Sequence, residues 1–176
     1  MVMPTTGWVL DSGATITTDS NHVLVLRPLT NGRPSLPGQG QGWQAAYWYP
    51  DRTDRWQNYV VGVTATNLGA QGSGANATIV VGYSETLGGF AVTISAARIT
   101  IQNRSRAHIY SGVIPAATAH RVNITLTHQL TVMIDGATVA SLPVGHVQGG
   151  IGFGVWKASA NSSLPFFTNL RVSSSS

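Results

Sequence analysis

Apolar and polar residues alternate with a period of two along most of the chain, and the period of an α-helix is nearly absent. The alternating segments are short, and clusters of Gly, Ser and Pro, which are typical of turns, separate them. They cover residues 22–27, 42–49, 55–66, 76–83, 89–95, 98–102, 121–128, 130–134, 137–142, 149–156 and 166–172. So many short strands without helices between them predict two stacked antiparallel sheets.

The alternation also predicts which side chains lie between the two sheets. In the segment that ends at Trp156, apolar residues share one face and glycines share the other. The residues that we expect to be buried are Val122, Ile124, Leu126, Val132, Ile134, Ile151, Phe153 and Val155. Asp135-Gly136 predicts a tight hairpin, because a type I′ turn needs positive φ at both central positions.

Composition favours one extracellular domain. The 176 residues are enough for one domain with a full core and few for two. Charged residues make up only 9%, against roughly 25% in an average soluble domain, which is typical of secreted or cell-surface β-proteins. The sequence has neither an apolar run of about 18 residues nor a signal segment, so we expect a mature or excised domain without membrane insertion.

The charges and the lack of cysteine narrow the function. The net charge of +4 comes from basic residues that are scattered along the chain, whereas nucleic-acid-binding proteins usually concentrate them. We therefore expect no nucleic-acid partner. The absence of cysteine excludes disulfides and thiolate metal sites.

Three parts of the chain resemble the concanavalin A-like lectin/glucanase superfamily, near its laminin-G-like and 3-keto-disaccharide-hydrolase-like branches. In this chain, Trp8–Leu10 together with residues 22–26 resembles the first strand pair of that fold. The segment 120–136 resembles its hallmark hairpin, and residues 149–154 with 167–172 resemble its closing strand pair. The resemblance implies an all-β, two-sheet antiparallel jelly-roll sandwich over residues 1–176, with the last strand beside the first. We expect a frayed tail at residues 173–176. Such folds host lectins, glycan-binding modules, glycosidases, lyases and adhesive spacers, so the fold alone does not decide the function.

An enzymatic site is the less favoured alternative. Retaining glucanases of this superfamily carry acids in the pattern Glu-x-Asp-x-x-Glu, because hydrolysis needs two carboxylates. No acids alternate in this way here, and the one close pair, Asp51 and Asp54, lies in a predicted loop. Jelly-roll polysaccharide lyases instead use Tyr, His and Arg or Gln, and His108 and Tyr110 provide two of these residue types at alternating positions.

Metal binding rests on little in the sequence. The five histidines lack the spacing of a zinc site. Calcium needs six to eight oxygen ligands, and Asp11 with nearby carbonyl groups is the candidate for one structural calcium ion. We expect no other cofactor.

The residues that point away from the predicted core offer a sugar-binding surface. Gly150, Gly152 and Gly154 form a glycine trough that ends at Trp156. We expect polar side chains from neighbouring strands to flank it, namely Arg98, Gln102, Arg121 and Asn123. Trp48 faces away from Tyr47 and Tyr49, so one side of its strand carries an exposed aromatic residue, and the sequence does not say which side.

We therefore expect a non-catalytic carbohydrate-binding or adhesive module of a secreted or cell-surface protein. The expected partner is a polysaccharide or glycan, and the arginines would favour an acidic sugar because they can bind carboxylates in a bidentate manner. The alternatives are a polysaccharide lyase or glycoside hydrolase with an atypical active site, and a purely structural interaction domain.

Overall fold

The computed structural model describes residues 6–11, 14–18, 24–28, 33–34, 43–49, 56–69, 75–157 and 165–174. The strands are β1 (Val9–Asp11), β2 (Ala14–Thr18), β3 (Leu24–Pro28), β4 (Arg33–Pro34), β5 (Trp43–Tyr49), β6 (Tyr59–Thr66), β7 (Asn76–Ser84), β8 (Gly88–Ile94), β9 (Arg98–Gln102), β10 (His108–Val113), β11 (Ala119–Leu126), β12 (Gln129–Ile134), β13 (Ala137–Pro143), β14 (Gly150–Lys157) and β15 (Phe166–Ser174). Within the described ranges, no helix has the length and apolarity to cross a membrane.

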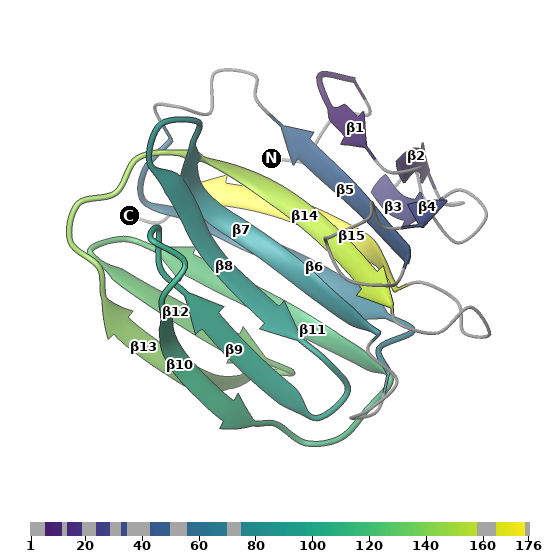
Figure 1. Ribbon diagram of the computed structural model, residues 1–176. Helices are drawn as coiled ribbons and strands as arrows, with labels where there is room; N and C mark the ends of the chain where they lie inside the picture. The colour runs from purple at the N-terminus through teal and green to yellow at the C-terminus, as the bar shows by residue number, and fades with distance from the viewer. Residues whose placement is uncertain are drawn as a thin grey trace.

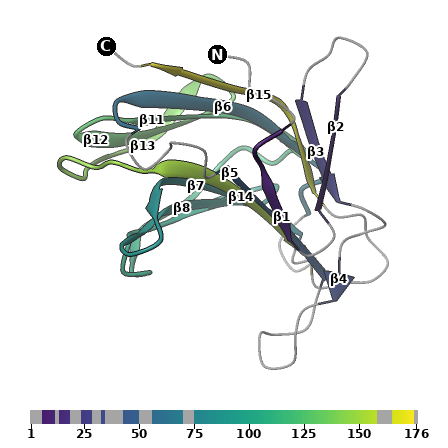
Figure 2. The ribbon, with the colours of Figure 1, turned by 90° about the horizontal axis from the view of Figure 1, so that it is seen from above.

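These strands form two antiparallel sheets that lie face to face (Figure 1, Figure 2). The eight-stranded sheet has the order β1-β5-β14-β7-β8-β9-β10, and β4 pairs with β5 at its edge. The seven-stranded sheet has the order β13-β12-β11-β6-β15-β3-β2. The predicted jelly-roll sandwich is therefore confirmed.

The two ends of the chain meet in the seven-stranded sheet. Phe167 of β15 pairs with Leu26 of β3, as expected for a jelly roll whose last strand returns beside an early one. The frayed tail was predicted to begin too early. Ser173 and Ser174 continue β15 and pair with β6, while residues 175–176 lie outside the described part.

The core fills the space between the sheets. All eight residues predicted to be buried are at most 4% exposed. In β6 every second residue is buried, as the period of two requires. Phe153 of β14 and Phe167 of β15 pack edge to face across the core, with ring centroids 5.1 Å apart. The sequence pattern therefore gave the correct strand phase in these strands.

A buried histidine ties one end of the sandwich together. The Nε2 of His120, on β11, lies 2.8 Å from the carbonyl oxygen of Ala96 in the β8–β9 turn of the other sheet. Its Nδ1 lies 2.6 Å from Oδ2 of Asp135. Asp135 and Gly136 have φ of 52° and 88°, which confirms the predicted hairpin turn.

We expect the free energy of unfolding to fall as the pH drops below about 4, and Asp135→Asn to make that fall shallower. Burial alone would raise the pKa of Asp135, but hydrogen bonds from His120 and from the Arg121 amide lower it below its usual value. A carboxyl group with a lowered folded-state pKa stabilises the fold above its unfolded pKa, and this stabilisation is lost as the pH falls through the folded value. Urea unfolding of both proteins at pH 7 and pH 3 checks this. Equal acid losses in both proteins would contradict it.

Candidate functional site

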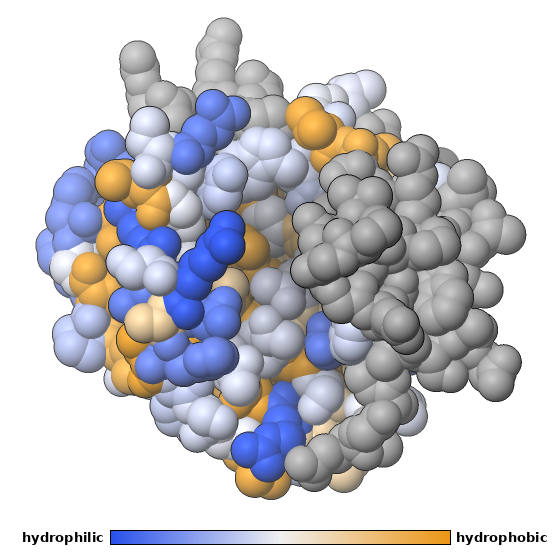
Figure 3. Space-filling model, viewed as in Figure 1, coloured by the Kyte–Doolittle hydropathy of each residue, from blue (hydrophilic) through white to orange (hydrophobic). Residues whose placement is uncertain are grey.

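The outer face of the eight-stranded sheet is concave. Seen from above, its middle strands β7 and β14 lie nearest the other sheet, and β8 and β4 on either side lie farther from it (Figure 2). The centre of this face carries weakly polar and apolar residues, and the most hydrophilic side chains lie mainly to its left and below it in the view of Figure 3. We call this surface the concave face.

The strand register arranges the outward-facing residues in rows across the concave face, because directly paired residues point to the same side. One row contains Trp48, Gly152, Val80, Ala91 and Gln102. The next row contains Gly154, Thr78, Thr93 and Thr100. The hydroxyl oxygens of Thr78 and Thr93 lie 2.8 Å apart, so the two side chains are hydrogen-bonded.

Trp48 lies over the glycine of its own row. Tyr47 and Tyr49 are buried, whereas Trp48 between them is half-buried and faces away from the core. A Cβ atom at Gly152 would lie 3.1 Å from Cε3 of the indole. A side chain at this position would push the indole a few tenths of an ångström away from the sheet.

A β-bulge brings Tyr83 onto the same face. Gly150 pairs with Tyr83 and Gly152 pairs with Val80, so two residues of β7 stand opposite one residue of β14. The extra residue reverses the side-chain phase, as bulges do. The rings of Tyr83 and Trp48 then meet edge to face, with centroids 4.2 Å apart and planes at 68°. We call these two side chains the aromatic wall.

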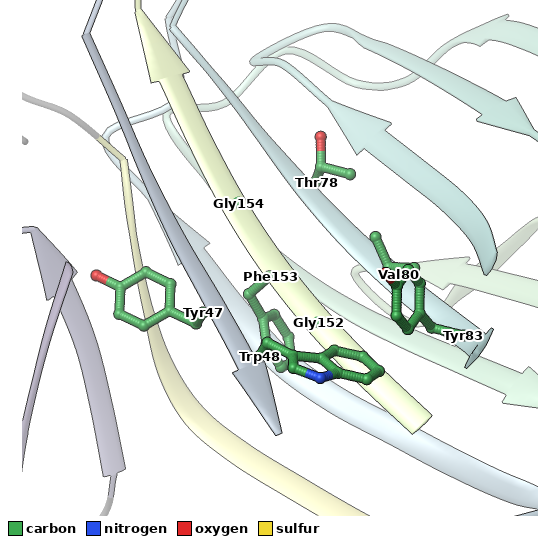
Figure 4. A pocket seen from close by; sticks show the side chains of 8 residues that line it. All are labelled: Tyr47, Trp48, Thr78, Val80, Tyr83, Gly152, Phe153 and Gly154. Carbon is green, nitrogen blue, oxygen red and sulfur yellow. The ribbon is translucent and has the colours of Figure 1, made fainter. Parts of the chain in front are cut away.

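The aromatic wall borders a pocket of about 270 Å³. Its lining residues are Tyr47, Trp48, Thr78, Val80, Tyr83, Gly152, Phe153 and Gly154. The Trp48 indole extends across β14 toward Tyr83 and Val80, and Thr78 lies further along β7 (Figure 4). An apolar site with a few convergent polar groups is the usual form of a small-molecule site.

The hydroxyl group of Tyr59 supports the pocket from inside the molecule. Tyr59 belongs to β6 of the seven-stranded sheet, and its hydroxyl donates to the carbonyl oxygen of Gly149 at 3.0 Å. It also accepts a hydrogen bond from the amide of Gly82 at 2.8 Å. Burial raises the pKa of the Tyr59 phenol well above its usual value, so the hydroxyl keeps its proton for this bond.

The structure brings four of the six predicted ligand residues to the concave face. Trp48 lines the pocket. Trp156, half-buried, follows Gly154 along β14 and pairs with Asn76. Arg98 and Gln102 lie on β9, about 14 Å from β14 at the usual strand spacing.

Arg121 and Asn123 are not part of this surface. Both lie on β11, in the seven-stranded sheet, and are exposed on its outer face, so they cannot flank the glycine trough. Alternation predicts correctly that they point away from the core. It cannot say toward which of the two outer faces, because that depends on the sheet to which the strand belongs.

Tyr83 and Thr78 are site residues that the sequence pattern did not predict. Strict alternation counted from the buried Val81 would place Tyr83 inside, and only the bulge turns it outward. Gly82 is the one signal that could have revealed the bulge, because its φ of 61° favours glycine. Thr78 was assigned to a strand but not to the site.

A second bulge separates the two residues of the lyase alternative. His108 pairs with Gln102 on the concave face, whereas Tyr110 pairs with the buried Ile101. His108 and Tyr110 therefore do not share a face of the sheet, although they alternate in the sequence. Nε2 of His108 lies 3.3 Å from Nε2 of Gln102.

The calcium expectation stays a prediction. Among the described residues, no three His, Asp or Glu side chains come together as metal ligands. The side chain of Asp11 is not among those described.

Comparison with known proteins reveals the fold. No family profile and no curated protein matches the sequence. Among solved structures, the carbohydrate-binding module CBM66 from Bacillus subtilis has a TM-score of 0.64 and 14% identity, over 96% of both chains. The Emp47p carbohydrate recognition domain has a TM-score of 0.61 and 12% identity, over 97% of this chain and 90% of its own. Alginate lyase A1-II' has a TM-score of 0.56 and 13% identity, over 91% and 83%.

This chain has the concanavalin A-like jelly-roll fold. The sequence identities of 11–14% to these structures support a shared fold but not a shared function. The function of this jelly roll must therefore be argued from its own site.

Proposed function

We propose that this jelly roll is a glycan-binding module whose ligand lies in the pocket beside the aromatic wall. One observation carries the proposal: Trp48 is half-buried on the concave face, lies over a glycine and is braced by Tyr83, with ring centroids 4.2 Å apart. The apolar face of a sugar ring can pack on a rigid indole, and Thr78 and the Tyr83 hydroxyl offer hydrogen bonds to its hydroxyl groups. The structural neighbours, which include a carbohydrate-binding module and a carbohydrate recognition domain, agree with this.

The proposal includes a secreted or cell-surface location and an extended ligand. Gln102 and Arg98 lie on the same face as the pocket, so a glycan that extends across β7 and β8 would reach them. An acidic sugar there would gain an ion pair with Arg98. Loss of acidic preference in Arg98→Gln, with neutral ligands unaffected, would identify that contact.

The first alternative function is that of a lyase or hydrolase, and the second alternative is a purely structural domain. The alginate lyases among the neighbours favour the first alternative. The separation of His108 and Tyr110 onto opposite faces counts against this particular pair. Product formation, measured as reducing ends or unsaturated uronates, would decide for the enzyme.

We expect Trp48→Ala to weaken glycan binding by at least roughly tenfold, because it removes the central aromatic contact. The measurement is calorimetric titration with glucan, mannan and fructan fragments and with alginate fragments. Trp48→Phe should retain part of the affinity, and Ser173→Ala, on the other sheet, all of it. If Trp156→Ala abolishes binding and Trp48→Ala does not, the site lies beyond Gly154.

A further inference from the structure

The bulge that exposes Tyr83 leaves the backbone groups of Gly82 outside the regular ladder. Buried backbone groups need partners, and here side chains provide them. The amide of Gly82 donates to the Tyr59 hydroxyl at 2.8 Å, and its carbonyl oxygen accepts from Nη2 of Arg104 at 2.7 Å. The residue next to the aromatic wall is therefore held on both sides by side chains from distant parts of the chain.

Arg104 also binds the segment that leads into β14. The same Nη2 donates to the carbonyl oxygen of Gln148 at 2.9 Å. One guanidinium nitrogen thus joins the bulge of β7 to the chain just before β14, which forms the pocket floor. The guanidinium lies 6.0 Å from the ring centroid of Phe90, a further attractive contact.

The turn that carries Arg104 is itself braced. The Oδ1 atom of Asn103 accepts hydrogen bonds from the amides of Ser105 at 2.9 Å and Ala107 at 3.0 Å. This local pattern holds a tight turn. The carbonyl oxygen of Arg104 would lie 3.0 Å from a Cβ at Gly88, so the turn rests closely on the start of β8.

We propose that Arg104 is a positioning residue of the ligand site, which it does not line. It fixes the bulge at Gly82 and thereby keeps Tyr83 against Trp48. This inference rests on the proposed function, because it assigns a role in glycan binding to a residue outside the pocket. Lysine can only partly replace it, because an ammonium group on a flexible stem does not reproduce the fixed geometry of the guanidinium.

The test is a double-mutant cycle between Arg104→Met and Tyr83→Ala. The ligand is the oligosaccharide of the panel above that the unaltered protein binds most tightly. Arg104→Met should weaken its binding roughly tenfold, and Arg104→Lys by less. In the Tyr83→Ala background, Arg104→Met should cause no further loss. Arg171→Met, which removes a guanidinium from the other sheet, is the control.

A measurement without ligand keeps the inference separate from the proposed function. Near-ultraviolet circular dichroism reports the Trp48–Tyr83 contact, and Arg104→Met and Tyr83→Ala should alter the same band. If no oligosaccharide binds, the proposed function fails, and an unchanged spectrum in folded Arg104→Met overturns the positioning role as well. A full tenfold loss in the Tyr83→Ala background would also overturn it, because Arg104 would then act on the ligand by another route.

Discussion

Phe153→Ala is expected to lower the free energy of unfolding by about 3–5 kcal/mol, the usual loss when a buried aromatic side chain is truncated. Phe153 is 2% exposed and contacts Phe167 of the opposite sheet, with ring centroids 5.1 Å apart. Its removal leaves a cavity between β14 and β15, and each of these strands is held between two paired neighbours, so their backbones cannot move inward to fill it. Urea denaturation followed by tryptophan fluorescence measures the change.

Val113→Ala is the matched control for this prediction. Val113 is apolar but 76% exposed, so its truncation should change the stability by no more than about 0.5 kcal/mol. A loss below about 1 kcal/mol for Phe153→Ala would mean that the two sheets do not pack through this residue.

Gly149→Ala is expected to destabilise the protein by about 4 kcal/mol or more, in the range that only severe packing conflicts reach. Its φ of 153° lies in a region that other residues rarely adopt. A Cβ atom here would lie 2.4 Å from the carbonyl carbon of Gly82 and 2.5 Å from the carbonyl oxygen of Tyr83. These are backbone atoms of the bulge, so relief requires that the bulge itself shifts.

Gly145→Ala separates the steric conflict from the backbone conformation. Gly145 also has a positive φ, 74°, but nothing lies within 4 Å of the position of a Cβ atom. Alanine there should cost only about 1–2 kcal/mol. Thermal unfolding of both variants tests the comparison, and equal losses would show that packing against the bulge contributes nothing.

The sequence predicted the fold well where the alternation is strict. β11 and β12 alternate without interruption next to the core, so burial followed directly from the period of two. In β14 the apolar residues are buried as predicted, although Gly150 and Gly152 between them are buried as well. β10 was missed because its side chains are mostly exposed and it contains a bulge after His108, which together remove the pattern.

The site was harder to predict because it depends on pairing between distant strands. Trp48 and the glycines of β14 were identified, since each is visible within its own strand. Arg121 and Asn123 were predicted on the wrong face, because the residues of a strand do not show to which of the two sheets the strand belongs. Tyr83 depends on one extra residue in β7, and Arg104 on a side chain that reaches Gly82 from another turn.

The position of Tyr59 has a consequence for how this domain can move. Its hydroxyl crosses from one sheet to hold Gly82 and Gly149 of the other. If one sheet slid over the other, the hydrogen bonds of Tyr59 to Gly82 and Gly149 would break before the side chains of the core came apart. The pocket should therefore meet its ligand as a nearly rigid body rather than close around it.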